Sequence, residues 1–210
     1  METKIIFIIG MHRCGTSLLA NCLVENGFSI GKTKNVDKNW QNPNGYYEND
    51  NFHNLHKKLL LYNNCNWSNI NKNKMKYTKK HIEEYRNLLQ IEFKNEKLIL
   101  IKDPRLTFFT DFLVDVCDKK YQYNFLFLIR NKEECCNSLS KAQNITTQNC
   151  ENLYDITIKQ YKSDFLKLDH HNILFDNQNV MKKISKFCNI NLNKNTTKLI
   201  DIKLYRNRIN

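Results

Sequence analysis

Two kinds of apolar run alternate along this chain. Short runs rich in β-branched and aromatic residues predict strands at residues 5–9, 98–102, 125–129 and 172–175. Longer stretches with apolar residues three or four positions apart predict helices. These helices are expected at residues 16–26, 51–61, 78–93, 108–117, 132–142, 152–168 and 180–188.

The alternation favours an α/β fold, because a strand followed by a helix usually returns to a parallel neighbour. We therefore expect a doubly wound three-layer sandwich with a central parallel sheet, formed by a single domain over residues 1–210. Ligands of such sheets gather at the carboxyl ends of the strands. Gly10, Asp103 and Arg130 each follow a predicted strand, so the functional site is expected beside them.

The first predicted strand runs into the loop GMHRCGTS, residues 10–17. Two glycines let the backbone approach an anion, and successive N–H groups with a helix N-terminus supply positive partial charge. The spacing is close to the P-loop pattern G-x-x-x-x-G-K-[ST], but Thr16 stands at the lysine position. The loop therefore predicts phosphate binding by a design that differs from that of ATPases.

A second segment has the same character. Residues 123–138 predict a buried strand that runs into a helix, with Arg130 at the end of the strand and Ser138 eight residues later. A guanidinium fork suits phosphate oxygens, and a hydroxyl can complete the shell. The alternative is an arginine that only caps a strand at the surface.

Together these segments resemble the donor site of sulfotransferases that use 3′-phosphoadenosine 5′-phosphosulfate (PAPS), in particular bacterial-type members with a G-M-H-R-x-G-T-S loop. The resemblance implies a P-loop-like fold and a product, adenosine 3′,5′-bisphosphate, formed without a metal. It also implies that Arg130 and Ser138 hold the 3′-phosphate of the donor. The residues implied to hold the 5′-phosphosulfate are His12, Arg13, Cys14, Gly15, Thr16 and Ser17.

Residues 42–48, NPNGYYE, resemble the N-P-x-G-Y-x-E segment of the same subgroup. Sulfuryl transfer needs a base for the proton of the acceptor, and a carboxylate near aromatic rings could have its pKa raised toward that task. Glu48 is therefore the first candidate for the base, and Asp103 is the second. The competing interpretation is that Glu48 complements the dipole of the following helix.

Residues 102–105 resemble the K-D-P-R segment of these enzymes. The resemblance implies that Lys102 touches the sulfuryl group and acts in catalysis with Arg13 and Glu48. Pro104 occupies the position at which cytosolic members carry a catalytic histidine, so that base is missing here. Asp103 could instead pair with Arg105 or Arg13 and orient it.

The formal net charge of +12 favours an anionic partner. No basic segment with interleaved aromatic residues is present, so nucleic acid is not expected. Scattered lysine can also serve solubility alone. Net basicity and the resemblance favour a glycan or glycolipid hydroxyl as the acceptor. Tyr46, Tyr47 and Trp67 could stack on sugar rings or simply pack in the core.

Eight cysteines show no regular spacing, so we expect reduced and mostly buried thiols. The pair His170-His171 lacks a third ligand at metal spacing, and no zinc is expected. No apolar run approaches the ~20 residues that span a bilayer. The sequence therefore predicts a soluble cytoplasmic protein without a transmembrane segment.

Two other functions remain open. A small P-loop kinase would use ATP, with Asp103 as its acidic metal partner, and a degenerate relative would bind nucleotide without transferring a group. The basic C-terminal segment, with Arg206 and Arg208, either reaches the donor or is a solvated tail.

Overall fold

The computed structural model describes residues 3–32, 34–35, 42, 45–70 and 74–204. Its centre is a parallel sheet of four strands in the order β4-β1-β5-β6. The strands are β1 (Lys4–Gly10), β4 (Leu98–Lys102), β5 (Gln122–Ile129) and β6 (Leu166–Asp169). The register pairs Ile8 with Lys102 and Gly10 with Leu128, so the carboxyl ends of these strands lie at one edge.

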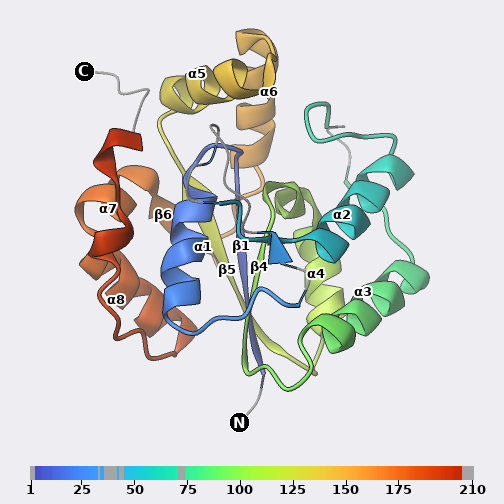
Figure 1. Ribbon diagram of the computed structural model, residues 1–210. Helices are drawn as coiled ribbons and strands as arrows, with labels where there is room; N and C mark the ends of the chain where they lie inside the picture. Colours follow the sequence, from blue (N-terminus) through green and yellow to red (C-terminus); the bar gives the residue numbers. More distant parts are fainter. Residues whose placement is uncertain (1–2, 33, 36–41, 43–44, 71–73, 205–210) are drawn as a thin grey trace.

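Helices cover both faces of the sheet (Figure 1). In that view α1, α7 and α8 lie on one side and α2, α3 and α4 on the other, while α5 and α6 extend beyond the carboxyl ends of the strands. The helices are α1 (Thr16–Glu25), α2 (Asp50–Tyr62), α3 (Lys79–Glu92), α4 (Thr110–Cys117), α5 (Lys132–Gln143), α6 (Thr147–Ile158), α7 (His170–Phe175) and α8 (Asn177–Cys188). Three 3-10 turns, η1 (Pro104–Phe109), η2 (Thr197–Leu199) and η3 (Ile202–Leu204), and a short antiparallel pair, β2 (Lys34–Asn35) with β3 (Glu48–Asn49), complete the described elements.

The expected α/β sandwich with a parallel central sheet is confirmed, but one predicted strand is wrong. Residues 172–175 belong to α7, and the fourth strand is β6, within the helix expected at 152–168. The strand ends and α7 begins at Asp169, because the Asp169 side chain accepts a hydrogen bond from the backbone N–H of His171 at 2.7 Å and so caps the helix.

The core lies between the sheet and its helices. Residues 5–9 of β1 are fully buried, because the strand has neighbours on both edges and helices on both faces. All eight cysteines are buried; the sequence predicted that most would be. Within the described residues, no helix is both long enough and apolar enough to cross a membrane.

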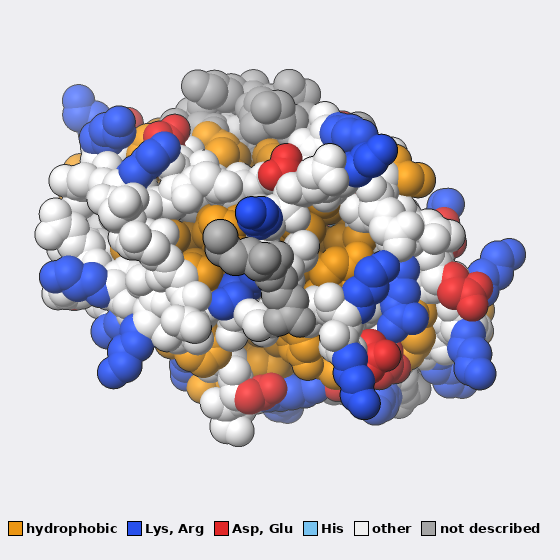
Figure 2. Space-filling model, turned by 90° about the horizontal axis from the view of Figure 1, so that it is seen from below, with side chains coloured by type: hydrophobic (Ala, Val, Ile, Leu, Met, Phe, Trp, Pro, Cys, Tyr) orange, Lys and Arg blue, Asp and Glu red, His pale blue; other side chains and the backbone are white. Residues whose placement is uncertain are grey.

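Basic side chains are spread over the molecule. Figure 2, which looks at the amino ends of the strands, shows lysine and arginine side chains scattered over the described part of this face, with acidic side chains among them. On this face the positive charge is not gathered into one patch.

Candidate functional site

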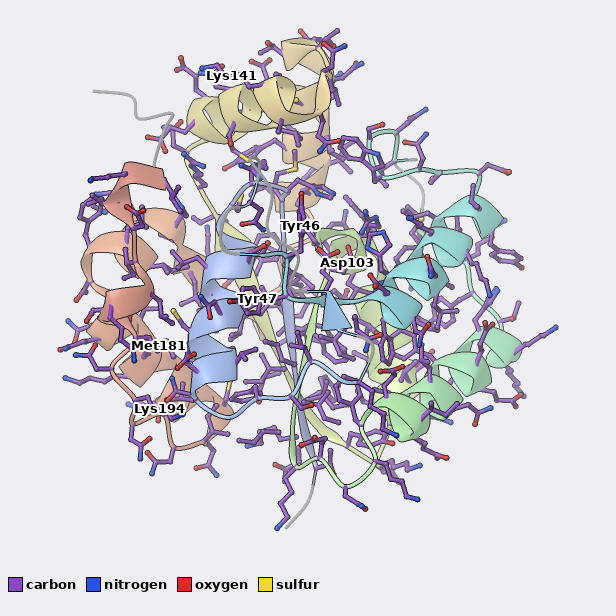
Figure 3. The ribbon with its side chains drawn as sticks, viewed as in Figure 1. Tyr46, Tyr47, Asp103, Lys141, Met181 and Lys194 are labelled. Atoms are coloured by element: carbon purple, nitrogen blue, oxygen red, sulfur yellow. The ribbon has the colours of Figure 1, made fainter. Side chains whose placement is uncertain are left out.

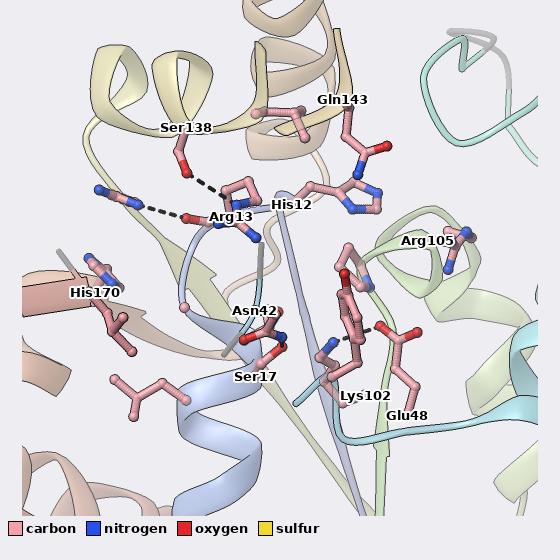
Figure 4. Close-up of a pocket in the computed structure, with 18 of the residues that line it drawn as sticks. His12, Arg13, Ser17, Asn42, Glu48, Lys102, Arg105, Ser138, Gln143 and His170 are labelled. Atoms are coloured by element: carbon pink, nitrogen blue, oxygen red, sulfur yellow. Dashed lines mark hydrogen bonds and ion pairs between the residues drawn. The ribbon is translucent and has the colours of Figure 1, made fainter. Parts of the chain in front are cut away.

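A cleft of about 330 Å³ lies at the carboxyl ends of the central strands. Figure 3 places Tyr46 and Asp103 at this end of the sheet, and Figure 4 shows the cleft itself. Segments far apart in the sequence meet there: the loop after β1, β3 with the start of α2, the end of β4, α5 and α7. Its polar and charged lining includes His12, Arg13, Thr16, Ser17, Glu48, His53, Lys102, Arg105, Arg130, Ser138, His170 and Asp201.

The loop after β1 is tightly folded. Arg13 and Gly15 adopt positive φ angles of 68° and 87°. Gly15 is the N-cap of α1 and offers no side chain to the first N–H groups of the helix, whose first turn contains no acidic residue. A Cβ atom at Gly15 would lie 2.4 Å from Cδ2 of His170, so only glycine fits between the loop and α7.

The loop and the β5–α5 turn are joined by direct hydrogen bonds (Figure 4). Nε of Arg13 donates to Oγ of Ser138 at 3.1 Å, and Nη1 of Arg130 donates to the carbonyl of Arg13 at 3.1 Å. Nε of Arg130 also pairs with Glu134 at 3.1 Å, which fixes the buried guanidinium. The structure thus brings together the arginines and the serine that the sequence indicated.

One residue of the predicted set lies outside the cleft lining. The side chain of Cys14 is fully buried, and its Sγ lies 3.6 Å from that of Cys135. His12, Arg13, Gly15, Thr16, Ser17, Arg130 and Ser138 all line the cleft.

Glu48 and Lys102 meet on the other side of the cleft. Nζ of Lys102 lies 2.7 Å from Oε1 of Glu48, and Nδ1 of His53 lies 3.0 Å from Oε2. Burial acts to raise the pKa of Glu48, but the charge of Lys102 and the hydrogen bond with His53 outweigh it and lower that pKa to about 2. The direction is opposite to the rise expected from the neighbouring aromatic residues, because the nearest partners are a cation and an imidazole.

Asp103 is held in a buried network. Its carboxylate accepts two hydrogen bonds from Nη1 of Arg105, at 2.8 and 2.9 Å, and lies 2.8 Å from Nδ1 of His56. Burial would raise the pKa of Asp103, but Arg105 and His56 hold it well below its usual value. The expected pairing with Arg105 is confirmed, and the carboxylate is saturated.

Aromatic and imidazole groups form another part of the lining. Tyr46 lines the cleft, whereas Tyr47 packs against the core. The ring of Trp67 stands edge-on to that of His12 at 5.3 Å. Burial, with the charge of Arg105, lowers the pKa of His12 to about 4, so His12 is neutral at physiological pH.

His53 and His170 line the cleft, but the sequence did not single out either one as a site residue. Burial, with the charge of Arg130, lowers the pKa of His170 to about 3, so this ring enters the site as a neutral group. His170 could have been noticed by its place after an apolar-polar alternation, once β6 was recognised. No sequence spacing marks His53.

Comparison with known proteins gives a fold. No protein-family model matches the chain, and no curated protein matches it. Among solved structures, the sulfotransferase domain from the Synechococcus PCC 7002 olefin synthase is similar over 97% of this chain and 76% of its own, with a TM-score of 0.56 and 15% identity. The sulfotransferase STF9 from Mycobacterium avium is similar over 95% of this chain and 67% of its own, with a TM-score of 0.63 and 12% identity.

The chain has the sulfotransferase fold. STF1 from Mycobacterium tuberculosis H37Rv is a further similar structure, with a TM-score of 0.51 and 14% identity over 95% of this chain and 71% of its own. At these identities the likeness concerns the arrangement of the chain.

Two other predictions concern ligands and the tail. Among the residues that the structure describes, no three His, Cys, Asp or Glu side chains are placed to share a metal ion. Arg206 and Arg208 lie outside the described residues, although Asp201 and Leu204 just before them line the cleft.

Proposed function

We propose that this protein is a sulfotransferase that moves a sulfuryl group from PAPS to a hydroxyl or amine acceptor. The observation that carries the proposal is the contact between Arg13, Ser138 and Arg130 in one cleft. A donor with phosphate groups at two positions needs two cationic sites at short separation, and the loop and the β5–α5 turn supply them side by side.

The residues fit the donor. The N-terminus of α1 faces the cleft with N–H groups that Gly15 leaves available, and Arg13 lies beside them. In this proposal residues 12–17 bind the 5′-phosphosulfate, while Arg130 and Ser138 bind the 3′-phosphate. Cys14 takes part through its backbone, because its side chain is in the core.

Arg13 and Lys102 then stabilise the negative charge that develops on the bridging oxygen as the acceptor attacks sulfur. Fixed cations placed before the reaction need no reorganisation during it. Glu48, and not Asp103, belongs to the site that removes the acceptor proton, because Arg105 and His56 saturate Asp103.

The acceptor is proposed to be a carbohydrate or glycolipid. Tyr46 and Trp67 present aromatic surface to the cleft, and aromatic rings pack well against the apolar faces of sugars. The net charge of +12 favours an acceptor that is itself anionic or that lies in a negatively charged membrane surface.

Ligand-induced stabilisation tests the donor. We expect adenosine 3′,5′-bisphosphate to raise the melting temperature by several degrees, and Mg-ATP to raise it much less. Arg130→Met should abolish the shift, whereas Lys167→Met, on the exposed side of β6, should keep it. Stabilisation by Mg-ATP alone would favour a kinase, and donor binding without transfer of labelled sulfate to any acceptor would favour a non-catalytic relative.

A further inference from the structure

Two histidines on α2, one turn apart, each pair with a carboxylate through the same ring nitrogen. Nδ1 of His56 lies 2.8 Å from Oδ2 of Asp103, and Nδ1 of His53 lies 3.0 Å from Oε2 of Glu48. An ionised carboxylate accepts a hydrogen bond from its neighbour and so favours the Nδ1–H form of the imidazole. The two pairs have the same chemistry in different surroundings.

The His56 pair is buried and complete. The side chains of His56 and Asp103 are 1% and 2% exposed. Nε2 of His56 lies 3.2 Å from the hydroxyl of Tyr85, which donates to it. Both ring nitrogens of His56 are therefore used, and this pair holds Asp103 and Arg105 in place.

The His53 pair faces the cleft. The His53 side chain is 22% exposed and lines the cleft. Within the described part of the chain, the hydrogen bonds of His53 involve Nδ1 and none involves Nε2. In the buried pair, Nε2 of His56 is bonded to Tyr85, whereas the corresponding Nε2 of His53 remains available to a ligand in the cleft.

Glu48 is poorly suited to take the proton itself. Lys102 occupies its Oε1 and His53 its Oε2. A carboxylate stabilised in its charged form by both partners is a weak base, consistent with its pKa of about 2.

We propose that Nε2 of His53 accepts the proton of the acceptor, and that Glu48 is the positioning residue that fixes the imidazole as its Nδ1–H form. This inference rests on the proposed sulfuryl transfer and names the proton acceptor for it. The proton of the acceptor O–H moves to Nε2 while the acceptor oxygen bonds to sulfur. The bond from sulfur to the bridging oxygen breaks and leaves its electron pair on adenosine 3′,5′-bisphosphate, and the imidazolium later returns its proton to water.

The groups around His53 are consistent with this role. Glu48 from β3 and Arg105 from η1 contact its Nδ1, and they pair in turn with Lys102 at the end of β4 and with Asp103. His12 lines the same cleft. Nη1 of Arg105 lies 3.3 Å from Nδ1 of His53. A guanidinium can only donate, so this contact favours Nδ1 as an acceptor and competes with Glu48. The same Nη1 is closer to both Asp103 oxygens, and Oε2 of Glu48, at 3.0 Å, is closer to Nδ1 of His53 than Arg105 is, so we assign Nδ1 as a donor to Glu48.

Nitrogen NMR tests the inference without turnover. Protein comprising residues 1–210 with ¹⁵N-labelled histidine, saturated with adenosine 3′,5′-bisphosphate at pH 8, is expected to show His53 as the Nδ1–H tautomer, with the signal assigned by its loss in His53→Asn. Glu48→Gln should shift the population away from this tautomer. An Nε2–H tautomer or an imidazolium in the wild-type protein would overturn the inference.

Kinetics provide the second test, with 2-naphthol, a phenol that keeps its proton at neutral pH, as the probe acceptor and labelled PAPS as the donor. His53→Asn retains an N–H donor for Glu48, and we expect kcat to fall about 10²–10³-fold with the affinity for adenosine 3′,5′-bisphosphate unchanged. His53→Gly should regain activity with added imidazoles, in proportion to their base strength, which a structural role would not produce. His81→Asn, at the start of α3, is the matched control and should retain wild-type rates.

The outcomes separate the two proposals. A His53→Asn variant within twofold of the wild-type rate overturns the role of His53 but leaves the sulfotransferase proposal standing. Absence of donor binding and of transfer in the wild-type protein overturns the sulfotransferase proposal, whereas the tautomer measurement, made without nucleotide, still decides how Glu48 and His53 are paired.

Discussion

The buried ion pair between Lys102 and Glu48 keeps the Glu48 carboxylate in its charged form. Their side chains are 3% and 13% exposed. Lys102→Met leaves the carboxylate without its cation, and we expect the free energy of unfolding at pH 7 to fall by about 3 kcal/mol. The double variant Lys102→Met with Glu48→Gln should recover most of this loss in urea denaturation, because no buried charge then remains unpaired.

The pH dependence of the same pair has a defined sign. The folded-state pKa of Glu48, about 2, lies below its ordinary value of 4.5, so its stabilising contribution is complete above pH 4.5 and is lost as pH falls toward 2. In Lys102→Met burial is no longer opposed by the cation, and the variant should lose less stability than the wild type over this window. If the difference in free energy of unfolding between the wild type and Lys102→Met stayed constant from pH 7 to pH 3, this explanation would be contradicted.

The direction of the Glu48 pKa could not be predicted from the sequence, although the residue itself could. Its partner Lys102 lies 54 positions away, and only the return of the chain to β4 brings them together. His53 was missed for a related reason, since a single histidine on an amphipathic helix has no distinguishing spacing. Arg13 and Arg130 were predictable because each follows a strand whose carboxyl end the fold places at the same edge. Ser138, within α5, was indicated only by the resemblance of its spacing from Arg130 to that of sulfotransferases.

At the scale of elements, the β1–α1 loop depends on close packing against α7. Gly15→Ala adds a Cβ atom 2.4 Å from His170 at a φ of 87°, whereas Gly27→Ala adds one at a φ of 94° with no atom within 4 Å. We expect Gly27→Ala to cost about 1 kcal/mol from backbone strain alone and Gly15→Ala about 3 kcal/mol. Thermal and urea unfolding measure both.

The same pair of variants separates packing from strain. Combining Gly15→Ala with His170→Ala should remove the collision and bring the cost of the alanine close to that of Gly27→Ala. Equal losses for the two single variants would show that α7 does not constrain the loop.

The one wrong strand shows which element the sequence concealed. β6 has only four residues. Its exposed Lys167 lies between Leu166, which is partly buried, and Leu168, which is buried, and this alternation is too short to predict a strand. The apolar residues at 172–175 gave the stronger signal, but the Asp169 cap begins a helix before them. Side-chain capping thus decided the local structure against apolar content.

For the whole molecule, the burial of every cysteine predicts that all the thiols react slowly in the folded protein. Burial raises the pKa of Cys117 and Cys188 to about 12, and thiolate is the reactive form. We expect no rapid reaction of the native protein with a disulfide reagent at pH 8, and reaction of all eight thiols after denaturation. A thiol that reacts rapidly in the native protein would show that the fold opens near it.

The hydrogen bonds from Arg130 to the Arg13 carbonyl and from Arg13 to Ser138 have a practical consequence for protein engineering. If the loop after β1 were replaced alone, it would lose its hydrogen bonds to the β5–α5 segment. Changing the preferred nucleotide therefore requires replacing the loop and the β5–α5 segment together. Libraries that randomise either one alone should yield mainly misassembled sites, whereas paired randomisation explores combinations that the scaffold can hold.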